Sequence, residues 1–167
     1  MRKTLPILFF LLQWCIVSLW SQGNYPIYVT TSLLPPYSLD LSDYSAQGSQ
    51  RLMVTIVVKD LDVTNLPVKL RIRMETAGVT IETLPTINTI PIYLDGGSAT
   101  VLFGEDFVDY FNINNLQFKG YSKESYRRSG LLPEGFYRFS VEVLHFQTNR
   151  VISNTSTATA WMAVGKP

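Results

Sequence analysis

Alternating apolar and polar residues mark two segments in the first half of the chain. In residues 51–59, RLMVTIVVK, aliphatic side chains recur at every second position, and in residues 68–75, VKLRIRME, apolar and charged residues alternate strictly. A period of two is typical of a β-strand with one buried face. A shift of one residue in the second segment would bury its charges, so we expect the charged face of this strand to lie in water.

The same alternation returns later in the chain. Residues 137–145 repeat it clearly, and turn residues such as Pro, Gly and Asn separate the runs at the spacing of an all-β fold. Short strands of this number cannot bury their apolar faces as one open sheet. The sequence therefore predicts an all-β, immunoglobulin-like β-sandwich of about seven or eight strands. The weaker runs lie at residues 27–34, 79–84, 90–94, 99–103 and 157–164.

One segment departs from the period of two. Residues 104–111, GEDFVDYF, place Phe107 and Phe111 at helical spacing, and Glu105 and Asp106 lie in the first turn, where the helix dipole favours acids. We expect one short helix here, in a connection between strands. The residues that follow, 112–130, are polar and lack a period, and we expect the longest loop of the protein there.

The N-terminal residues have the pattern of a secretory signal. Arg2 and Lys3 precede an apolar, uncharged run over residues 5–20, and polar residues follow at once. This run is shorter than the roughly 20 residues that a membrane-spanning helix requires. We expect a signal peptide over residues 1–21 that is cleaved near its end.

Cleavage would leave a single domain over residues 22–167 in the periplasm, on the outer-membrane surface or outside the cell. An uncleaved N-terminal anchor is the alternative, because Leu19 and Trp20 are bulkier than an ideal cleavage site requires. Cys15, the only cysteine, would leave with the signal, so disulfides, cysteine catalysis and Cys-containing zinc sites are not expected. The remaining domain is close to neutral, which argues against nucleic acid as a partner.

No motif in the sequence indicates catalysis, a cofactor or a metal. His145 is the only histidine, and its position late in a strand favours a half-buried structural residue. Glu105, Asp106 and Asp109 cluster, but they lack the alternating spacing of a calcium loop, and helix capping explains them. We therefore do not expect an enzyme.

Two segments are candidates for binding a partner. The segment YPIYVTTSLLPPYSLDLSDY contains consecutive prolines that cannot donate ladder hydrogen bonds, which predicts an edge strand followed by an extended crossing segment. This edge strand either pairs with another chain or merely closes a sheet. The loop over residues 112–130 interleaves aromatic and basic side chains, a mixture that binds proteins or stacks on sugar rings. The candidate residues are Tyr28, Pro35, Pro36, Tyr37, Tyr121, Tyr126, Arg127 and Arg128.

Residues 132–139, LPEGFYRF, have the form of a turn that leads into a strand, with Tyr137 two residues after Gly135. This pattern resembles the tyrosine corner of immunoglobulin-like and fibronectin-type sandwiches. In that corner the phenol forms a hydrogen bond to the backbone a few residues upstream.

The segment LLPPYSLDLSDY at residues 33–44 resembles the TANFOR domain, a module near the N-terminus of large secreted or surface proteins of Bacteroidota. The resemblance extends to RLMVTIVVKD at 51–60, to LPEGFYRFSVEV at 132–143 and to the final strand with Trp161. It implies a cell-envelope or extracellular setting and an association with secretion or gliding surface machinery. It brings no functional residues, and because family members continue into further domains, it leaves open whether this chain is a stand-alone copy or a fragment.

Taken together, these patterns predict a non-catalytic interaction or assembly domain of a secreted bacterial protein, with an envelope or surface protein as its partner. A carbohydrate-binding module that uses the aromatic residues of the 112–130 loop is the alternative. A protein partner would bind through sheet edges and the 112–130 loop, whereas a sugar would bind to Tyr121, Tyr126 and neighbouring aromatic residues.

Overall fold

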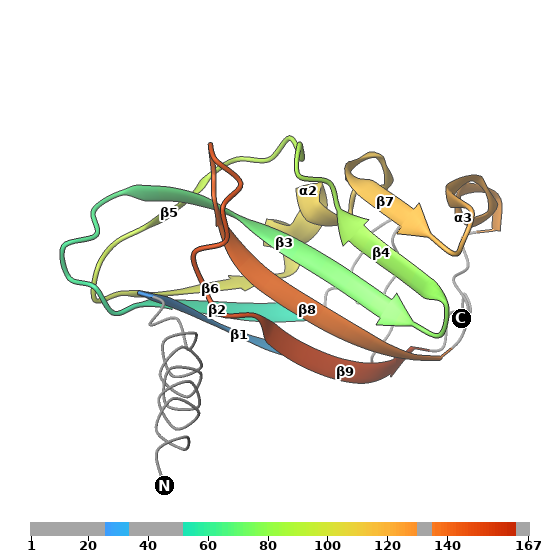
Figure 1. The fold of residues 1–167 in the computed structure, drawn as a ribbon, viewed down its shortest axis with the longest axis horizontal. Coiled ribbons are helices and arrows are strands. Elements are labelled where there is room, and N and C mark those ends of the chain that lie inside the picture. The colour runs from blue at the N-terminus through green and yellow to red at the C-terminus, as the bar shows by residue number, and fades with distance from the viewer. Residues whose placement is uncertain (1–25, 34–51, 130–134, 163–167) are drawn as a thin grey trace, which may run out of the picture.

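Two antiparallel β-sheets pack face to face in a computed structural model that describes residues 26–33, 52–129 and 135–162 (Figure 1). The smaller sheet has the strand order β1-β2-β6, and the larger has the order β7-β4-β3-β8-β9, with β5 also paired to β3. The smaller sheet consists of β1 (Ile27–Leu33), β2 (Leu52–Val58) and β6 (Ala99–Phe103). The larger sheet consists of β3 (Leu66–Thr76), β4 (Val79–Thr83), β5 (Ile92–Leu94), β7 (Leu116–Lys119), β8 (Gly135–His145) and β9 (Ser156–Met162).

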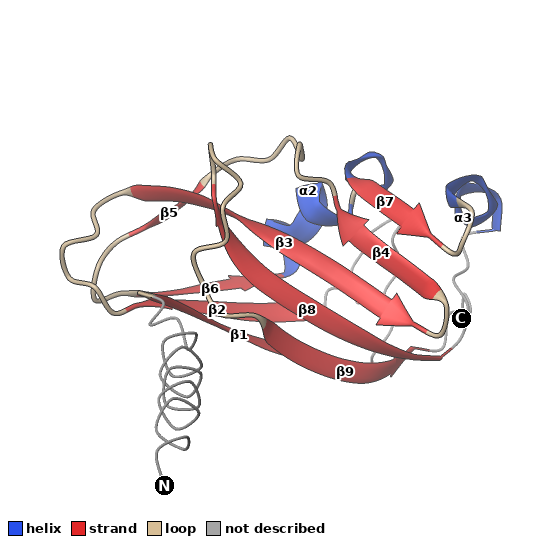
Figure 2. Cartoon of the chain, in the orientation of Figure 1, coloured by secondary structure: helices blue, strands red, loops and turns tan. Residues whose placement is uncertain are grey.

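The all-β sandwich expected from the sequence is confirmed, and strands form in every run that alternates (Figure 2). The expectation of a loop over residues 112–130 is wrong, because β7 and the helix α3 (Lys123–Ser129) lie there. In β7 only Leu116 is buried, and Phe118 packs against the core from a partly buried position. A strand this short carries too few alternating residues for its period to be recognised.

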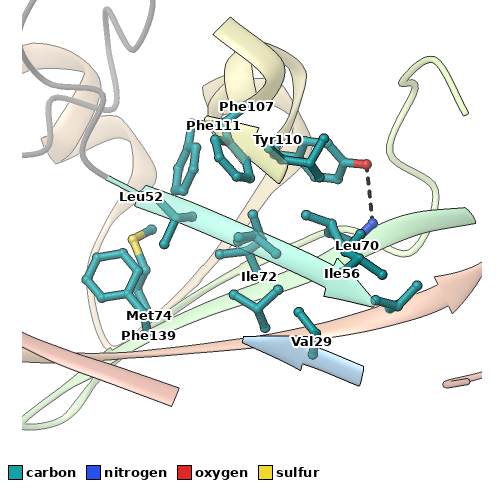
Figure 3. Close-up of a cluster of buried hydrophobic side chains, with 14 of the residues drawn as sticks. Val29, Leu52, Ile56, Leu70, Ile72, Met74, Phe107, Tyr110, Phe111 and Phe139 are labelled. Carbon is teal, nitrogen blue, oxygen red and sulfur yellow. Dashed lines mark hydrogen bonds between the residues drawn. The ribbon is translucent and has the colours of Figure 1, made fainter. Parts of the chain in front are cut away.

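The interior lies between the two sheets and is lined by the alternate residues of their strands. From Leu52 to Val58 every second side chain of β2 is buried, and the same holds for β3 from Val68 to Met74. Figure 3 shows the side chains of these strands meeting those of β1 and β8 in one apolar cluster. The period of two in the sequence therefore reports one shared core.

The expected short helix at residues 104–111 is confirmed, as a 3₁₀ turn η1 (Gly104–Phe107) that continues into α2 (Val108–Phe111). Phe107, Tyr110 and Phe111 are fully buried and enter the space between the sheets (Figure 3). The ring centroid of Phe107 lies 6.3 Å from that of Tyr110 and 6.2 Å from that of Phe111, in edge-to-face arrangements. The connection after β6 is thus part of the core.

Tyr110 also completes the hydrogen bonding of the central strand β3. On one side of β3, β5 pairs with residues 66–68 and β4 with residues 73–76, which leaves a gap between them. In this gap the Leu70 N–H donates to the Tyr110 hydroxyl at 3.2 Å, and the Ile72 N–H donates to Thr83 Oγ1 at 3.1 Å. Side chains thus supply the acceptors that a neighbouring strand would otherwise provide.

The expectation that the whole charged face of β3 lies in water is wrong at Lys69. This side chain is only 5% exposed, because Pro85 and Phe146 lie against it. Its Nζ donates to the Pro85 carbonyl oxygen at 2.7 Å and lies 5.5 Å from the Phe146 ring centroid. Burial lowers the pKa of Lys69, which the alternating pattern could not reveal.

Tyr137, the residue of the expected tyrosine corner, is buried on the inner face of β8. Burial, together with the nearby Tyr121, raises the pKa of Tyr137 to about 12. The turn residues 132–134 lie outside the described part of the chain, so the corner hydrogen bond stays a prediction.

The hydroxyl of Tyr110 gives a first test of the fold. Tyr110→Phe removes the acceptor for the Leu70 N–H, and we expect the free energy of unfolding to fall by about 1–3 kcal/mol, the cost of one buried unpaired donor. Tyr93→Phe is the control, because the Tyr93 side chain is 54% exposed. Urea denaturation measures both, and equal stabilities would contradict the role of Tyr110.

Candidate functional site

The outer face of the larger sheet carries a lattice of paired charges. Arg71 pairs with Glu142 on β8, and Arg73 pairs with Glu82 on β4 at 2.9 Å. Each pair joins residues directly opposite one another on neighbouring strands, the geometry in which opposite charges stabilise a sheet. Arg138 of β8 likewise contacts Glu75 of β3 at 2.5 Å.

This lattice lines a shallow groove of about 320 Å³, which Ser140, Thr155 and Thr157 also border. Each guanidinium that lines the groove lies beside a carboxylate. A bound anion would therefore have to compete with an acidic side chain for every arginine. The arrangement is that of a stabilised, solvated sheet surface.

Glu142 is bound by two side chains of the lattice region, Arg71 and Thr155. Burial on its own would raise the pKa of Glu142, but a hydrogen bond from Thr155 Oγ1 at 2.6 Å and the Arg71 guanidinium outweigh it. The pKa of Glu142 therefore lies below its ordinary value.

The outer face of the smaller sheet has the opposite character. Its strands align in three rows of outward residues, and Val101 and Phe103 of β6 lie beside Thr55 and Met53 of β2. Val101 is 56% exposed and Phe103 is 44% exposed. We call this surface the apolar face, and no charged residue belongs to it. Its residues are Tyr28, Thr30, Ser32, Met53, Thr55, Val57, Ala99, Val101 and Phe103.

The strand β1 lies at the edge of the smaller sheet, as expected from the sequence, but part of its outer edge is occupied. The Val29 N–H donates to Asn154 Oδ1 at 2.8 Å, and Asn154 Nδ2 donates to the Val29 carbonyl oxygen at 3.1 Å. Ile27 forms a β-bridge with Ser153. Side chain and backbone from the segment before β9 thus take the place of a neighbouring strand, which favours the interpretation that β1 closes a sheet.

The edge strand β7 of the larger sheet is also blocked. Lys123 Nζ donates to the Leu116 carbonyl oxygen at 3.0 Å, and the exposed Lys119 ends the strand. A lysine on an edge strand is a common means of preventing edge-to-edge pairing.

On the outer side of β6, the described residues supply no neighbouring strand. Ser98 O accepts from the Val58 N–H at 3.0 Å, so even-numbered residues of β6 direct their backbone groups to β2 and odd-numbered residues direct theirs outward. The outward Phe103 N–H donates to Asp106 Oδ2 at 2.9 Å. Within the described residues, no hydrogen bond joins the outward backbone groups of Ala99 and Val101 to another group.

Of the residues proposed from the sequence, Tyr28 lies on the apolar face, where Lys59 Nζ stands 4.0 Å from its ring centroid. Tyr121 is half-buried and packs against the core near β7. The structure therefore separates these tyrosines onto different sheets. Pro35, Pro36 and Tyr37 lie outside the described residues.

The basic residues proposed from the sequence lie on α3, with the larger sheet (Figure 1). Arg127 pairs with Glu124 one turn earlier at 2.5 Å, and Arg128 Nε donates to the Glu124 carbonyl oxygen at 3.4 Å. The side chain of Tyr126 is outside the described part of the structure. These contacts tie the helix to itself and do not form a shared surface with Tyr28.

Val101 and Phe103 were not among the residues proposed from the sequence. Their run, ATVLF, carries exposed valine and phenylalanine at alternate positions, which is a weak signal because core strands look alike. Only the register with β2 shows that these side chains face outward.

The residues with catalytic potential have structural roles. His145 is half-buried at the end of β8, as expected, and its Nδ1 accepts from the Thr148 N–H at 3.4 Å. Asp106 accepts from the Phe103 N–H at the start of the helical turn, which confirms the expected capping. The described residues contain no group of His, Cys, Asp and Glu that could hold a metal ion.

Two further results concern the chain as a whole. No family model matches it, and no curated protein matches it. In the described ranges, no helix is both long enough and apolar enough to cross a membrane.

Glu142 provides a test of the charge lattice. Because its pKa is lowered by folding, the carboxylate contributes stability that is present above pH 4.5, its ordinary pKa, and is lost as the pH falls through the lower folded value. We expect Glu142→Gln to reduce the free energy of unfolding at neutral pH and this reduction to shrink as the solution is acidified. Urea denaturation across this range measures it, and Glu105→Gln, an exposed carboxylate outside the lattice, is the control. A deficit independent of pH would contradict the assignment.

Proposed function

We propose that this chain is a non-catalytic interaction or assembly domain of the cell envelope or extracellular space, which binds a protein partner through the apolar face. The observation that carries this proposal is the exposure of Val101 and Phe103 in register with Met53 and Thr55, at the opposite end of the face from Tyr28 and the Lys59 ammonium that lies over its ring. Contiguous exposed apolar side chains on a folded domain are typical of binding surfaces.

The two outer faces differ in what association would cost. On the larger sheet, binding of a partner would remove water from arginine–glutamate pairs. The free energy of this desolvation often exceeds the attraction between the two charges. On the apolar face, burial of Val101, Phe103 and Met53 removes apolar surface from water without breaking an ion pair. Association through the smaller sheet is therefore the favoured mode.

The composition of the apolar face also fits an interface. Phe103, Met53 and Tyr28 are residue types enriched at the centres of protein–protein interfaces, where charged residues are depleted. Thr55 lies at the centre of the face and Thr30 and Ser32 lie on β1, where their hydroxyl groups can form hydrogen bonds with a partner.

The N-terminal signal pattern and the resemblance to the TANFOR domain support an envelope or extracellular location. On this basis we place the domain among the surface proteins associated with bacterial secretion or gliding. The alternative of a carbohydrate-binding module needs exposed aromatic rings in the 112–130 segment, whereas Tyr121 packs partly buried against the core. No observation favours that alternative.

The apolar face can be tested by a double substitution. Val101→Ser combined with Phe103→Ser should leave the domain folded, because both side chains are exposed and such changes usually alter stability by within about 0.5 kcal/mol each. We expect an envelope protein that is recovered with the wild-type chain in a quantitative pull-down to be lost with this variant.

Ile90→Ser is the matched control, since Ile90 is an exposed aliphatic residue outside the apolar face. It should recover the same protein as the wild type. If the double variant, shown to be folded by circular dichroism, recovers an unchanged set of proteins, the proposed use of the apolar face is wrong.

A further inference from the structure

We propose that the partner binds as an extended segment that pairs along β6 and adds a strand to the smaller sheet, with basic residues flanking an apolar centre. This inference rests on the proposed function and deepens it, because it names the backbone edge that is used and the chemistry of the partner segment. Addition of a strand to an open sheet edge is a recurring mode of peptide recognition.

The backbone of β6 has hydrogen-bonding groups in the orientation that such pairing requires. The N–H and C=O groups of Ala99 and Val101 point away from β2, and no hydrogen bond within the described residues occupies them. The strand itself, ATVLF, contains no proline and no charged residue. It thus lacks two of the devices that prevent edge pairing, a proline and a charged side chain on the edge.

Two other edge strands of the sandwich, β1 and β7, contrast with it. At β1 the outward groups of Val29 are taken by Asn154, and at β7 the Leu116 carbonyl oxygen is taken by Lys123. The same fold therefore closes β1 and β7 by specific side-chain contacts, whereas on β6 a side chain takes only the Phe103 N–H and, among the described residues, none takes the outward groups of Ala99 and Val101. The edge that stays open adjoins the apolar face, because Val101 and Phe103 belong to both.

The charges around β6 indicate the partner. Residues 74–118 contain no Lys, Arg or His, and the acids among them include Asp95 before β6 and Glu105 and Asp106 after it. All three of these side chains are exposed. Acidic side chains therefore precede and follow β6, whereas the ammonium of Lys59, just after β2, lies over the Tyr28 ring of β1. A strand with lysine or arginine at its ends would be attracted to these acids.

A second copy of this chain fits the same edge poorly. If two β6 strands paired antiparallel about Val101, the stretch around Asp95 of one copy would run beside Glu105 and Asp106 of the other, at both ends. Like charges facing one another in this way are destabilising. The charge pattern thus favours a foreign segment over self-association.

The partner's side chains follow from the register of an added strand. Every second residue of that strand would lie on the same side as Val101 and Phe103 and would extend the apolar face. Apolar side chains, above all β-branched ones, suit these positions. The expected segment therefore alternates β-branched apolar residues with small polar residues between basic ends.

A synthetic peptide of alternating valine and threonine, with a pair of lysines at each end, tests this inference by fluorescence anisotropy with the whole chain. We expect saturable binding that weakens with added salt, because exposed charges are screened. A peptide with the same centre and glutamates in place of the lysines should bind at least about tenfold more weakly, since like charges across an interface cost several kcal/mol.

Val101→Pro is the decisive variant. It removes the outward N–H of β6 and leaves the hydrogen bonds to β2 in place, as proline on an edge strand allows. We expect binding of the lysine peptide to weaken about five- to tenfold, the value of one hydrogen bond in an interface. Val101→Thr keeps both the N–H and the branched shape, and it should bind like the wild type.

Absence of saturable binding by the lysine peptide, or equal binding by folded Val101→Pro and Val101→Thr, would overturn the inference. A dimer in analytical ultracentrifugation that Val101→Pro abolishes would also overturn it and assign the edge to a second copy. A different result distinguishes failure of this inference from failure of the proposed function. If Val101→Pro keeps the envelope partner while the double serine variant loses it, the apolar face binds without strand pairing.

Discussion

The structure depends on the burial of alternate side chains between two sheets. In β2 and β3 one set of residues enters the interior and the other set is left outside, so the inner faces must match one another while the outer faces need not. The fold can therefore carry two outer surfaces of unlike chemistry. The outer face of the larger sheet carries a lattice of arginine–glutamate pairs. The outer face of the smaller sheet is uncharged around Val101 and Phe103.

Where a buried strand has no neighbouring strand, its backbone groups need other hydrogen-bond partners, because a buried backbone group without a partner lowers the stability of the fold. Tyr110 and Thr83 meet this demand along β3, and Asn154 meets it along β1. Side chains thus act as substitutes for missing strands at several places. Against this background the outward groups of Ala99 and Val101 are an exception, since no described residue bonds to them, and this is the reason that we assign binding to the edge of β6.

Much of the fold could be predicted from the sequence, because strictly alternating apolar and charged residues show which face of a strand such as β3 is buried. β7 could not, since its four residues are too few to show a period. Lys69 was expected in water because alternation reveals which side of a strand a residue is on, and not what covers that side. The candidate site was missed for a related reason: whether β6 ends a sheet depends on which strands pair, and that is decided by the whole chain.

Native-state hydrogen exchange at two matched positions tests the central claim most directly. Val29 and Val101 are both valines in edge strands, with amides that point away from β2, but among the described residues Val29 has a side-chain acceptor and Val101 has none. We expect the Val29 amide to exchange slowly and the Val101 amide to exchange rapidly in the unbound protein, because protection follows hydrogen bonding. Equally slow exchange at both amides would show that β6 is covered and would contradict the account.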